Sequence, residues 1–257
     1  MKLAHGARAA AAITHREVLR FVQQRERFVA ALVRPLVWLL VFASGLRTVL
    51  DSGGDYRSYI LPGLCGMVQL FHGMQSSLSM VYDREMGSMR ILLTSPLPRG
   101  FLLMARLFAS CVVSIGQVYI FLAAATVFGV PVSAEGALRL LPALILGGLL
   151  TGALGMLLAA RIRQLENFAG VMNFVIFPMF FLSPALYPLA RFAADAPIVH
   201  GLAWLNPFTH AVELNRAALY GDGGGLSLPI VLLSTGGIAW AAIQAYDPAR
   251  GMAPRRR

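Results

Sequence analysis

Lysine is almost absent from this sequence: Lys2 is the only one among 257 residues, so arginine supplies nearly all of the positive charge. A phosphate-binding P-loop needs a glycine-rich turn that ends in Gly-Lys-Ser or Gly-Lys-Thr. Such a turn cannot be formed anywhere after Lys2. The chain therefore has no ATP-hydrolysing motor of this type, and any work it performs must draw on a partner ATPase or on an ion gradient.

Charged residues are scarce as well. Asp, Glu, Lys and Arg make up 13% of the chain, about half the share typical of soluble domains, and 57% of the residues are hydrophobic. A net charge of +10 would suit a nucleic-acid-binding protein only if it formed a basic face on a soluble fold. Here the charges lie in short runs between apolar stretches. The composition predicts an all-α integral membrane protein that binds the lipid bilayer and no nucleic acid.

Only two cysteines occur, Cys65 and Cys111, and both lie within apolar runs. Their separation matches no metal-ligand spacing, so we expect small buried side chains, no metal site and no catalytic residue. The N-terminal segment has no continuous apolar core followed by a cleavage site, so we expect no removable signal peptide. No internal repeat or low-complexity linker is visible, which predicts one membrane domain over residues 1–257.

Long apolar stretches dominate the sequence. A spanning helix needs roughly 20 mostly apolar residues. Six windows meet this requirement, each bounded by charged or turn-forming residues. The predicted spans are 29–49, 59–80, 107–128, 140–160, 168–189 and 226–245.

The arginines alternate between the segments that connect these spans. Segments 1–34, 81–106, 161–167 and 246–257 together hold 17 Lys and Arg against 6 Asp and Glu. The three intervening segments hold 5 against 6. Because positively charged loops stay on the cytoplasmic side, both termini are predicted to be cytoplasmic. In a bacterial cell this places the protein in the inner membrane as a multi-pass protein.

Two of the cytoplasmic segments have helical periodicity. Residues 13–29 place Val18, Phe21 and Val22 near helical spacing among several arginines, which predicts either a helix on the membrane surface or a basic flank that fixes the topology. Residues 83–97 mix charges with apolar residues that recur at helical spacing and end at two prolines. This pattern predicts a short amphipathic helix between spans two and three.

The segment 190–225, external by the charge rule, is long and apolar. Asn206 followed by Pro207 is typical of a helix start, and Gly221 is suited to its end. We expect external helices that dip into the outer leaflet, where Trp204 suits the membrane interface. Trp204, Asn206 and Pro207 are the candidate external gate residues.

Few polar residues interrupt the spans. Gln69 and His72 share a helical face in the second span, and Gln117 and Asn173 lie at comparable depth in the third and fifth. Polar side chains in hydrocarbon turn inward and find partners. These four residues either form hydrogen bonds between helices or line a path for a substrate, and the sequence leaves both interpretations open.

Two longer patterns resemble one family. The first is Tyr82-Asp83-Arg84-Glu85-x-Gly87 followed by Leu92-Leu93-x-Ser95-Pro96. The second runs from Phe181-Leu182-Ser183-x-Ala185-Leu186-Tyr187-Pro188 to Leu205-Asn206-Pro207-Phe208-Thr209-His210-Ala211-Val212-Glu213-x-x-Arg216-x-x-x-Tyr220-Gly221. In this order, within a six-span frame, they resemble the ABC-2-type transporter permeases, the membrane subunits of type II ABC exporters.

The resemblance implies a homodimer or heterodimer of permease subunits that carries two cytoplasmic ABC ATPase subunits. The chain itself would hold no cofactor, since ATP and Mg bind to the partner ATPase. The segment 83–97 would be the coupling helix that docks on that ATPase. Its contact residues would be Asp83, Arg84, Glu85, Met86, Leu92 and Leu93. The family exports hydrophobic drugs, lipid-linked glycans and lipo-oligosaccharides, so an amphipathic cargo is expected.

Two other classes of membrane protein fit the sequence less well. A proton-coupled carrier would bury acidic relays in its spans, but His72 is the only clearly titratable residue at mid-span. An intramembrane serine protease would need glycine two residues before a nucleophile such as Ser44, where this chain has Phe42. The carrier is the stronger alternative to the exporter subunit.

Overall fold

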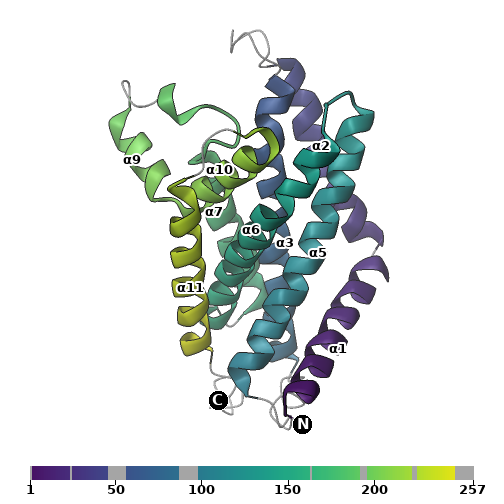
Figure 1. Ribbon diagram of the computed structural model, residues 1–257. Helices are drawn as coiled ribbons and strands as arrows, with labels where there is room; N and C mark the ends of the chain where they lie inside the picture. Colours follow the sequence, from purple (N-terminus) through teal and green to yellow (C-terminus); the bar gives the residue numbers. More distant parts are fainter. Residues whose placement is uncertain are drawn as a thin grey trace.

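The computed structural model describes residues 2–23, 25–45, 56–86, 98–162, 164–191, 196–221 and 225–246. Within these ranges the regular elements are helices, and no strand is found (Figure 1). The predicted all-α fold is therefore confirmed. The elements are α1 (Lys2–Gln23), α2 (Arg25–Gly45), α3 (Tyr56–Glu85), α5 (Arg99–Val127), α6 (Ala134–Arg161), α7 (Leu165–Phe181), η1 (Leu189–Arg191), α9 (Pro197–Leu205), α10 (Pro207–Tyr220) and α11 (Ser227–Ala245).

Three of the described helices are long and apolar enough to cross a membrane: α5, α6 and α11. The described part of α2 has a shorter apolar stretch, Leu32–Val41, and α7 is likewise apolar but shorter. The third helix, α3, is 30 residues long but holds more polar residues. Every predicted span thus overlaps a helix, but α7 ends at Phe181, well before the predicted end of the fifth span at residue 189, and residues 46–49 of the first span lie outside the described residues. Length and composition support membrane crossing for three of the helices.

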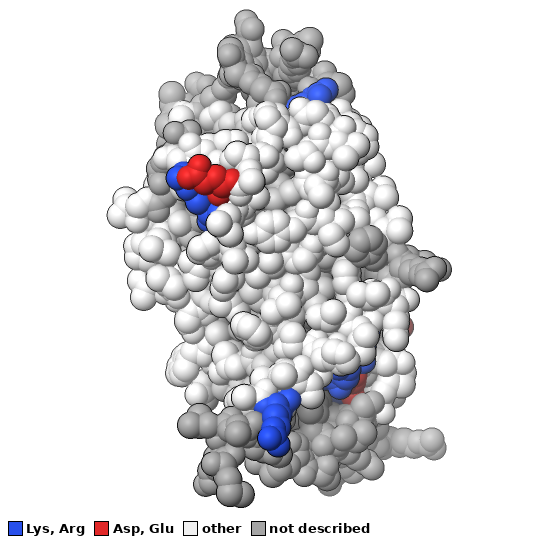
Figure 2. Space-filling model, turned by 45° about the vertical axis from the view of Figure 1, so that its right-hand side comes forward, with Lys and Arg blue, Asp and Glu red and all other residues white. Residues whose placement is uncertain are grey.

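Figure 2 shows charged side chains in the upper and lower parts of one face of the molecule. Between them lies a band in which the described residues of this face carry no charge. Such a band is what a bilayer-embedded surface requires, because a charge in the hydrocarbon region is costly. This distribution agrees with the predicted membrane protein.

The helix α6 occupies the centre of the bundle, between α3, α5, α10 and α11 (Figure 1). It packs closely against α3 because both helices carry glycine at the crossing. A Cβ atom added to Gly73 would lie 2.7 Å from the backbone carbon of Thr151, and one added to Gly155 would lie 2.6 Å from the carbonyl oxygen of Gly73. Small residues at a crossing allow two backbones to approach in this way.

The predicted ends of the external helix are confirmed. The side chain of Asn206 accepts a hydrogen bond from the backbone N–H of Phe208 at 3.1 Å, which caps α10, and Pro207 follows in the first turn. Gly221 ends the helix with a φ of +82°, a left-handed conformation that glycine adopts without strain. Local chemistry therefore determines both ends of α10.

The predicted helix over residues 13–29 is wrong in its boundaries. Helix α1 begins at Lys2 and ends at Gln23, and α2 begins at Arg25. Helix α1 packs against α5 beside the bundle (Figure 1). One of its contacts with α3 is an edge-to-face pair between the rings of Phe21 and His72, 6.2 Å apart. Tertiary contacts therefore extend the helix well beyond its amphipathic part.

Candidate functional site

A polar cleft lies between α1, α3 and α5. Its empty space is about 540 Å³. The lining residues are Glu17, Arg20 and Phe21 of α1, His72, Gln75, Ser76 and Ser79 of α3, and Ser110, Val113 and Gln117 of α5. A second cleft of about 610 Å³ shares His72, Gln75 and Gln117 with the first and continues towards Arg34 of α2 and Asn173 of α7.

Gln117 is the polar group that distinguishes this region. Its side chain is 3% exposed, and the imidazole of His72 is the neighbouring group that can donate to its Oε1 atom. Both residues line the two clefts. The amide of Gln117 therefore forms part of the wall of both clefts.

The four predicted path residues do not behave alike. His72 and Gln117 line both clefts, and Asn173 lines the second. Gln69 instead donates from Nε2 to the carbonyl oxygen of Leu144 at 2.6 Å, and its side chain fills the space beside Gly147. Gln69 therefore ties α3 to α6, whereas the other three surround the clefts.

The end of α3 holds the first of the predicted coupling residues. Asp83 accepts a hydrogen bond from Arg106 of α5 at 2.7 Å, and the two side chains are only 19% and 12% exposed. Sequence analysis did not identify Arg106, because 23 positions separate it from Asp83 and only the antiparallel packing of α3 and α5 joins them.

The next two residues fasten α3 to the neighbouring helix ends. Arg84 is 9% exposed and donates from Nη1 to the carbonyl oxygens of Ala159 at 3.1 Å and Ile162 at 3.4 Å, where α6 ends. A cation is favourable there because the C-terminus of a helix is negatively polarised. The carboxylate of Glu85 accepts from the backbone N–H of Leu165, the first residue of α7, at 3.3 Å.

Asp83, Arg84 and Glu85 therefore all bind to neighbouring helices of this chain. Met86 is 61% exposed and free of the bundle. Leu92 and Leu93 lie outside the described residues, as does most of the predicted coupling helix 83–97. The ATPase contact of this segment stays a prediction, to which the structure adds an anchoring role for its first residues.

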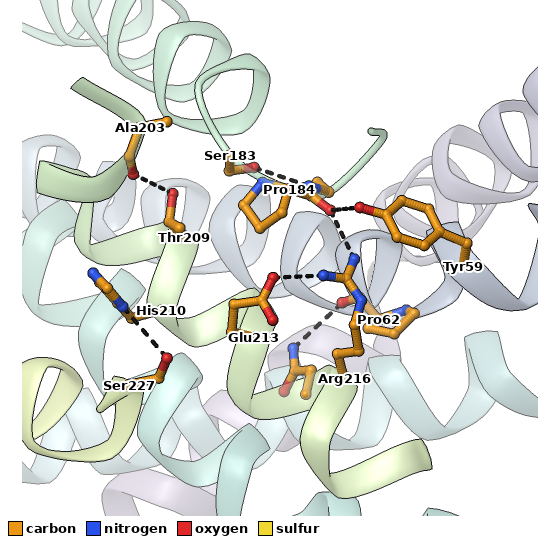
Figure 3. Close-up of polar contacts among 12 residues, drawn as sticks. Tyr59, Pro62, Ser183, Pro184, Ala203, Thr209, His210, Glu213, Arg216 and Ser227 are labelled. Atoms are coloured by element: carbon orange, nitrogen blue, oxygen red, sulfur yellow. Dashed lines mark hydrogen bonds and ion pairs between the residues drawn. The ribbon is translucent and has the colours of Figure 1, made fainter. Parts of the chain in front are cut away.

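At the opposite end of the bundle, Asn206 joins α10 to α7. Its Nδ2 atom donates to the carbonyl oxygens of Met179 at 2.7 Å and Leu182 at 2.8 Å, at the end of α7. Thr209 donates to the carbonyl oxygen of Ala203 at 2.6 Å (Figure 3). Trp204 is 48% exposed, and Pro207 lies in the first turn of α10. The external gate candidates therefore meet where α7, α9 and α10 converge.

No candidate metal centre accompanies these polar groups in the described ranges. No three His, Cys, Asp or Glu side chains among these residues could hold a metal ion. Cys65 and Cys111 are both buried thiols without a disulfide. The polar groups of this part of the chain are thus arranged for hydrogen bonding and for joining helices.

The sequence is similar to known transport proteins. A family model described as ABC-2 type transporter matches residues 8–220, from α1 to the end of α10. A protein of Pyropia yezoensis named as a transport permease, ycf38, is 27% identical over 217 residues, which cover 80% of this chain and 72% of the relative. Its namesake in Porphyra purpurea is 25% identical over 245 residues, covering 90% and 81%. A protein of Escherichia coli (strain K12) named as a multidrug ABC transporter permease, YbhR, is 28% identical over 166 residues, covering 63% and 44%.

Proposed function

This chain belongs to the ABC-2 type transporter family, and we propose that it is the permease subunit of an ATP-driven exporter that moves a hydrophobic or amphipathic molecule out of the cytoplasm. Family membership supports a transport component that works with separate ATPase subunits. Because lysine is absent after Lys2, this chain cannot form a P-loop, which also supports an ATPase on a separate subunit.

The pair of clefts around Gln117 is the observation that supports the cargo class. The groups shared by both clefts, His72, Gln75 and Gln117, are neutral hydrogen-bonding side chains. The charged lining residues are Glu17 and Arg20 of the first cleft, which pair with each other at 3.8 Å, and Arg34 of the second. The largest fully buried side chains of the described bundle are apolar. An ionic cargo would need paired charges to replace its hydration, whereas an amphipathic molecule needs a few hydrogen-bonding groups beside apolar surface.

The proposed assembly contains two permease copies and two ATPase subunits. Six helices of each copy, α2, α3, α5, α6, α7 and α11, would cross the inner membrane, with α1 at its cytoplasmic surface. The contacts of Asp83, Arg84 and Glu85 support a route for coupling. Through these contacts, a movement of the segment that begins at Met86 would shift the ends of α5, α6 and α7 together.

Replacing Gln117 with leucine is expected to lower transport several-fold without destabilising the protein. The change replaces a buried amide whose Oε1 atom accepts no hydrogen bond from the backbone of the described residues, so we expect only a small change in the free energy of unfolding. It also removes a hydrogen-bonding group from both clefts. The measurements are cargo export and thermal unfolding in detergent.

Gln69→Leu serves as the matched control for that variant. It removes the hydrogen bond to Leu144, so we expect a loss of stability of about 1–2 kcal/mol. If the two substitutions had equal effects on stability and on transport, the assignment of Gln69 to helix packing and of Gln117 to the cargo path would be contradicted.

The proposed orientation predicts which positions an impermeant thiol reagent can reach. In a variant without Cys65 and Cys111, single cysteines at positions 135 and 200 are expected to react in intact cells. Cysteines at positions 3, 88 and 252 are expected to react only after the membrane is permeabilised. Labelling of position 88 in intact cells would contradict the orientation.

A further inference from the structure

A large cavity opens where α9, α10 and the start of α11 meet the segment after α7. Its empty space is about 1260 Å³, and its lining is mostly apolar. The polar groups that face it come largely from α10, where Thr209, Glu213 and Arg216 lie along one face of the helix (Figure 3). Neither the proposed cargo path nor the coupling contacts use this cavity.

Its central feature is the ion pair between Glu213 and Arg216. Arg216 donates from Nη1 to Oε1 of Glu213 at 2.5 Å and from Nη2 to the carbonyl oxygen of Pro184 at 2.8 Å (Figure 3). The guanidinium also lies over the ring of Tyr59, 4.4 Å from its centroid. These contacts hold the arginine in place, and its side chain is 13% exposed.

Glu213 is more accessible than its partner. Its side chain is 32% exposed, and Oε2 accepts no hydrogen bond from the described residues. Nε of Arg216 is buried without an acceptor in the same part of the chain. The cavity thus presents one open carboxylate oxygen beside a largely buried guanidinium, and the pair carries no net charge.

Two histidines complete the polar lining. Nε2 of His210 lies 2.9 Å from the carbonyl oxygen of Trp204, so this nitrogen carries the proton and donates. Nε2 of His200 accepts from the indole N–H of Trp204 at 3.2 Å, which leaves the proton of a neutral ring on Nδ1. His200 therefore offers a further donor at the side of the cavity that α9 forms.

The rim of the cavity continues into apolar surface. On α9, Ile198 and Leu205 are 77% and 81% exposed, and at the start of α11 Leu226 is 72% exposed. Exposed apolar side chains of this size suit contact with lipid chains. A molecule with its polar end in the cavity could therefore lay its hydrocarbon along α9 and α11.

We propose that this cavity binds the headgroup of a bilayer phospholipid that carries a primary ammonium and a phosphate, as phosphatidylethanolamine does. The ammonium would donate to Oε2 of Glu213, and the phosphate would lie on the side of Arg216 and His200. The carboxylate of Glu213 would repel a purely anionic headgroup, and the guanidinium of Arg216 would repel a purely cationic one. A zwitterion complements both charges of the pair.

The proposal requires membrane insertion but neither the ATPase nor the cargo, so it stands apart from the proposed function. The purified chain is exposed to an equimolar mixture of phosphatidylethanolamine, phosphatidylcholine and phosphatidylglycerol with identical acyl chains, and bound lipid is quantified by native mass spectrometry. Wild-type protein is expected to prefer phosphatidylethanolamine by about tenfold, the effect of one charge-assisted hydrogen bond.

Glu213→Gln is expected to abolish this preference and to increase binding of phosphatidylglycerol, because Arg216 loses its counter-ion. The matched control is Glu135→Gln, which removes an exposed Glu–Arg pair, with Arg139, and neither residue lines the cavity. This control should bind lipid as the wild type does. Equal binding of the three lipids by wild-type protein, or an unchanged preference in Glu213→Gln, would overturn the proposal.

A second pair of variants leaves the ion pair intact. Gly225 lines the cavity, and a Cβ atom added there meets nothing within 4 Å, so Gly225→Trp can fill the cavity without a clash. Gly201 of α9 is equally open but does not line it. Gly225→Trp should lose about tenfold in phosphatidylethanolamine binding and Gly201→Trp should not. Equal binding by the two would contradict a lipid site here.

Discussion

Replacing Gly73 with leucine is expected to abolish the folded protein. Its Cβ atom would lie 2.7 Å from the backbone of Thr151 and 2.8 Å from the backbone nitrogen of Gly152. Neither helix can relieve this clash by rotating a side chain, so α3 and α6 must separate along the centre of the bundle. We expect a cost of about 3 kcal/mol or more, at the upper end for an overpacked core. The measurements are the monodisperse yield in detergent and the unfolding temperature.

The control for this variant is Gly116→Leu on α5. A Cβ atom added to Gly116 meets nothing within 4 Å, although this glycine also lies in the middle of a long helix. Its yield should equal that of the wild type. Normal yield of Gly73→Leu would show that α3 and α6 do not cross as closely as the structure indicates.

Reversing one charge at the end of α3 is expected to uncouple transport from ATP hydrolysis. Asp83→Arg places a second cation against Arg106, where both side chains are largely buried. Breaking a buried pair and leaving like charges together costs about 3 kcal/mol. Because this pair joins α3 to α5, the end of α3 would lose its link to α5 and keep only the contacts of Arg84 and Glu85 with α6 and α7. ATPase activity and cargo transport are measured in the reconstituted complex.

The double variant Asp83→Arg, Arg106→Asp restores opposite charges and should recover a large part of the coupling. Glu135→Arg is the surface control, since Glu135 and Arg139 are 71% and 62% exposed and exposed pairs contribute little. Failure of the double variant together with a defect in Glu135→Arg would show that general charge effects, rather than the α3–α5 joint, cause the loss.

Several features of the fold could be predicted because they depend on local sequence. Asn206, Pro207 and Gly221 bound α10 through capping geometry that involves only their neighbours. Length and apolar composition identified α5, α6 and α11 in the same way. The end of α1 at Gln23 and the start of α2 at Arg25 had no such signal, since the residues on both sides are all compatible with a helix.

The roles of polar residues were harder to predict because they depend on partners distant in the chain. Asp83 and Arg84 have the exposed character of loop residues in the sequence, yet the structure buries them against Arg106 and the end of α6. Gln69 and Gln117 have the same side chain at similar depth, but only Gln69 finds a backbone partner. Which polar side chains remain open is decided by packing between helices.

The proposed function is tested most directly by purifying the tagged chain from its native membrane in mild detergent and measuring ATP hydrolysis in the purified sample. We expect a P-loop ATPase to co-purify with the chain, and its activity to rise when an amphipathic cargo is added. Gln117→Leu should keep the ATPase bound but lose this stimulation. Isolation of the chain without any ATPase, together with cargo movement driven by a proton gradient alone, would contradict an ATP-driven permease and support a secondary carrier.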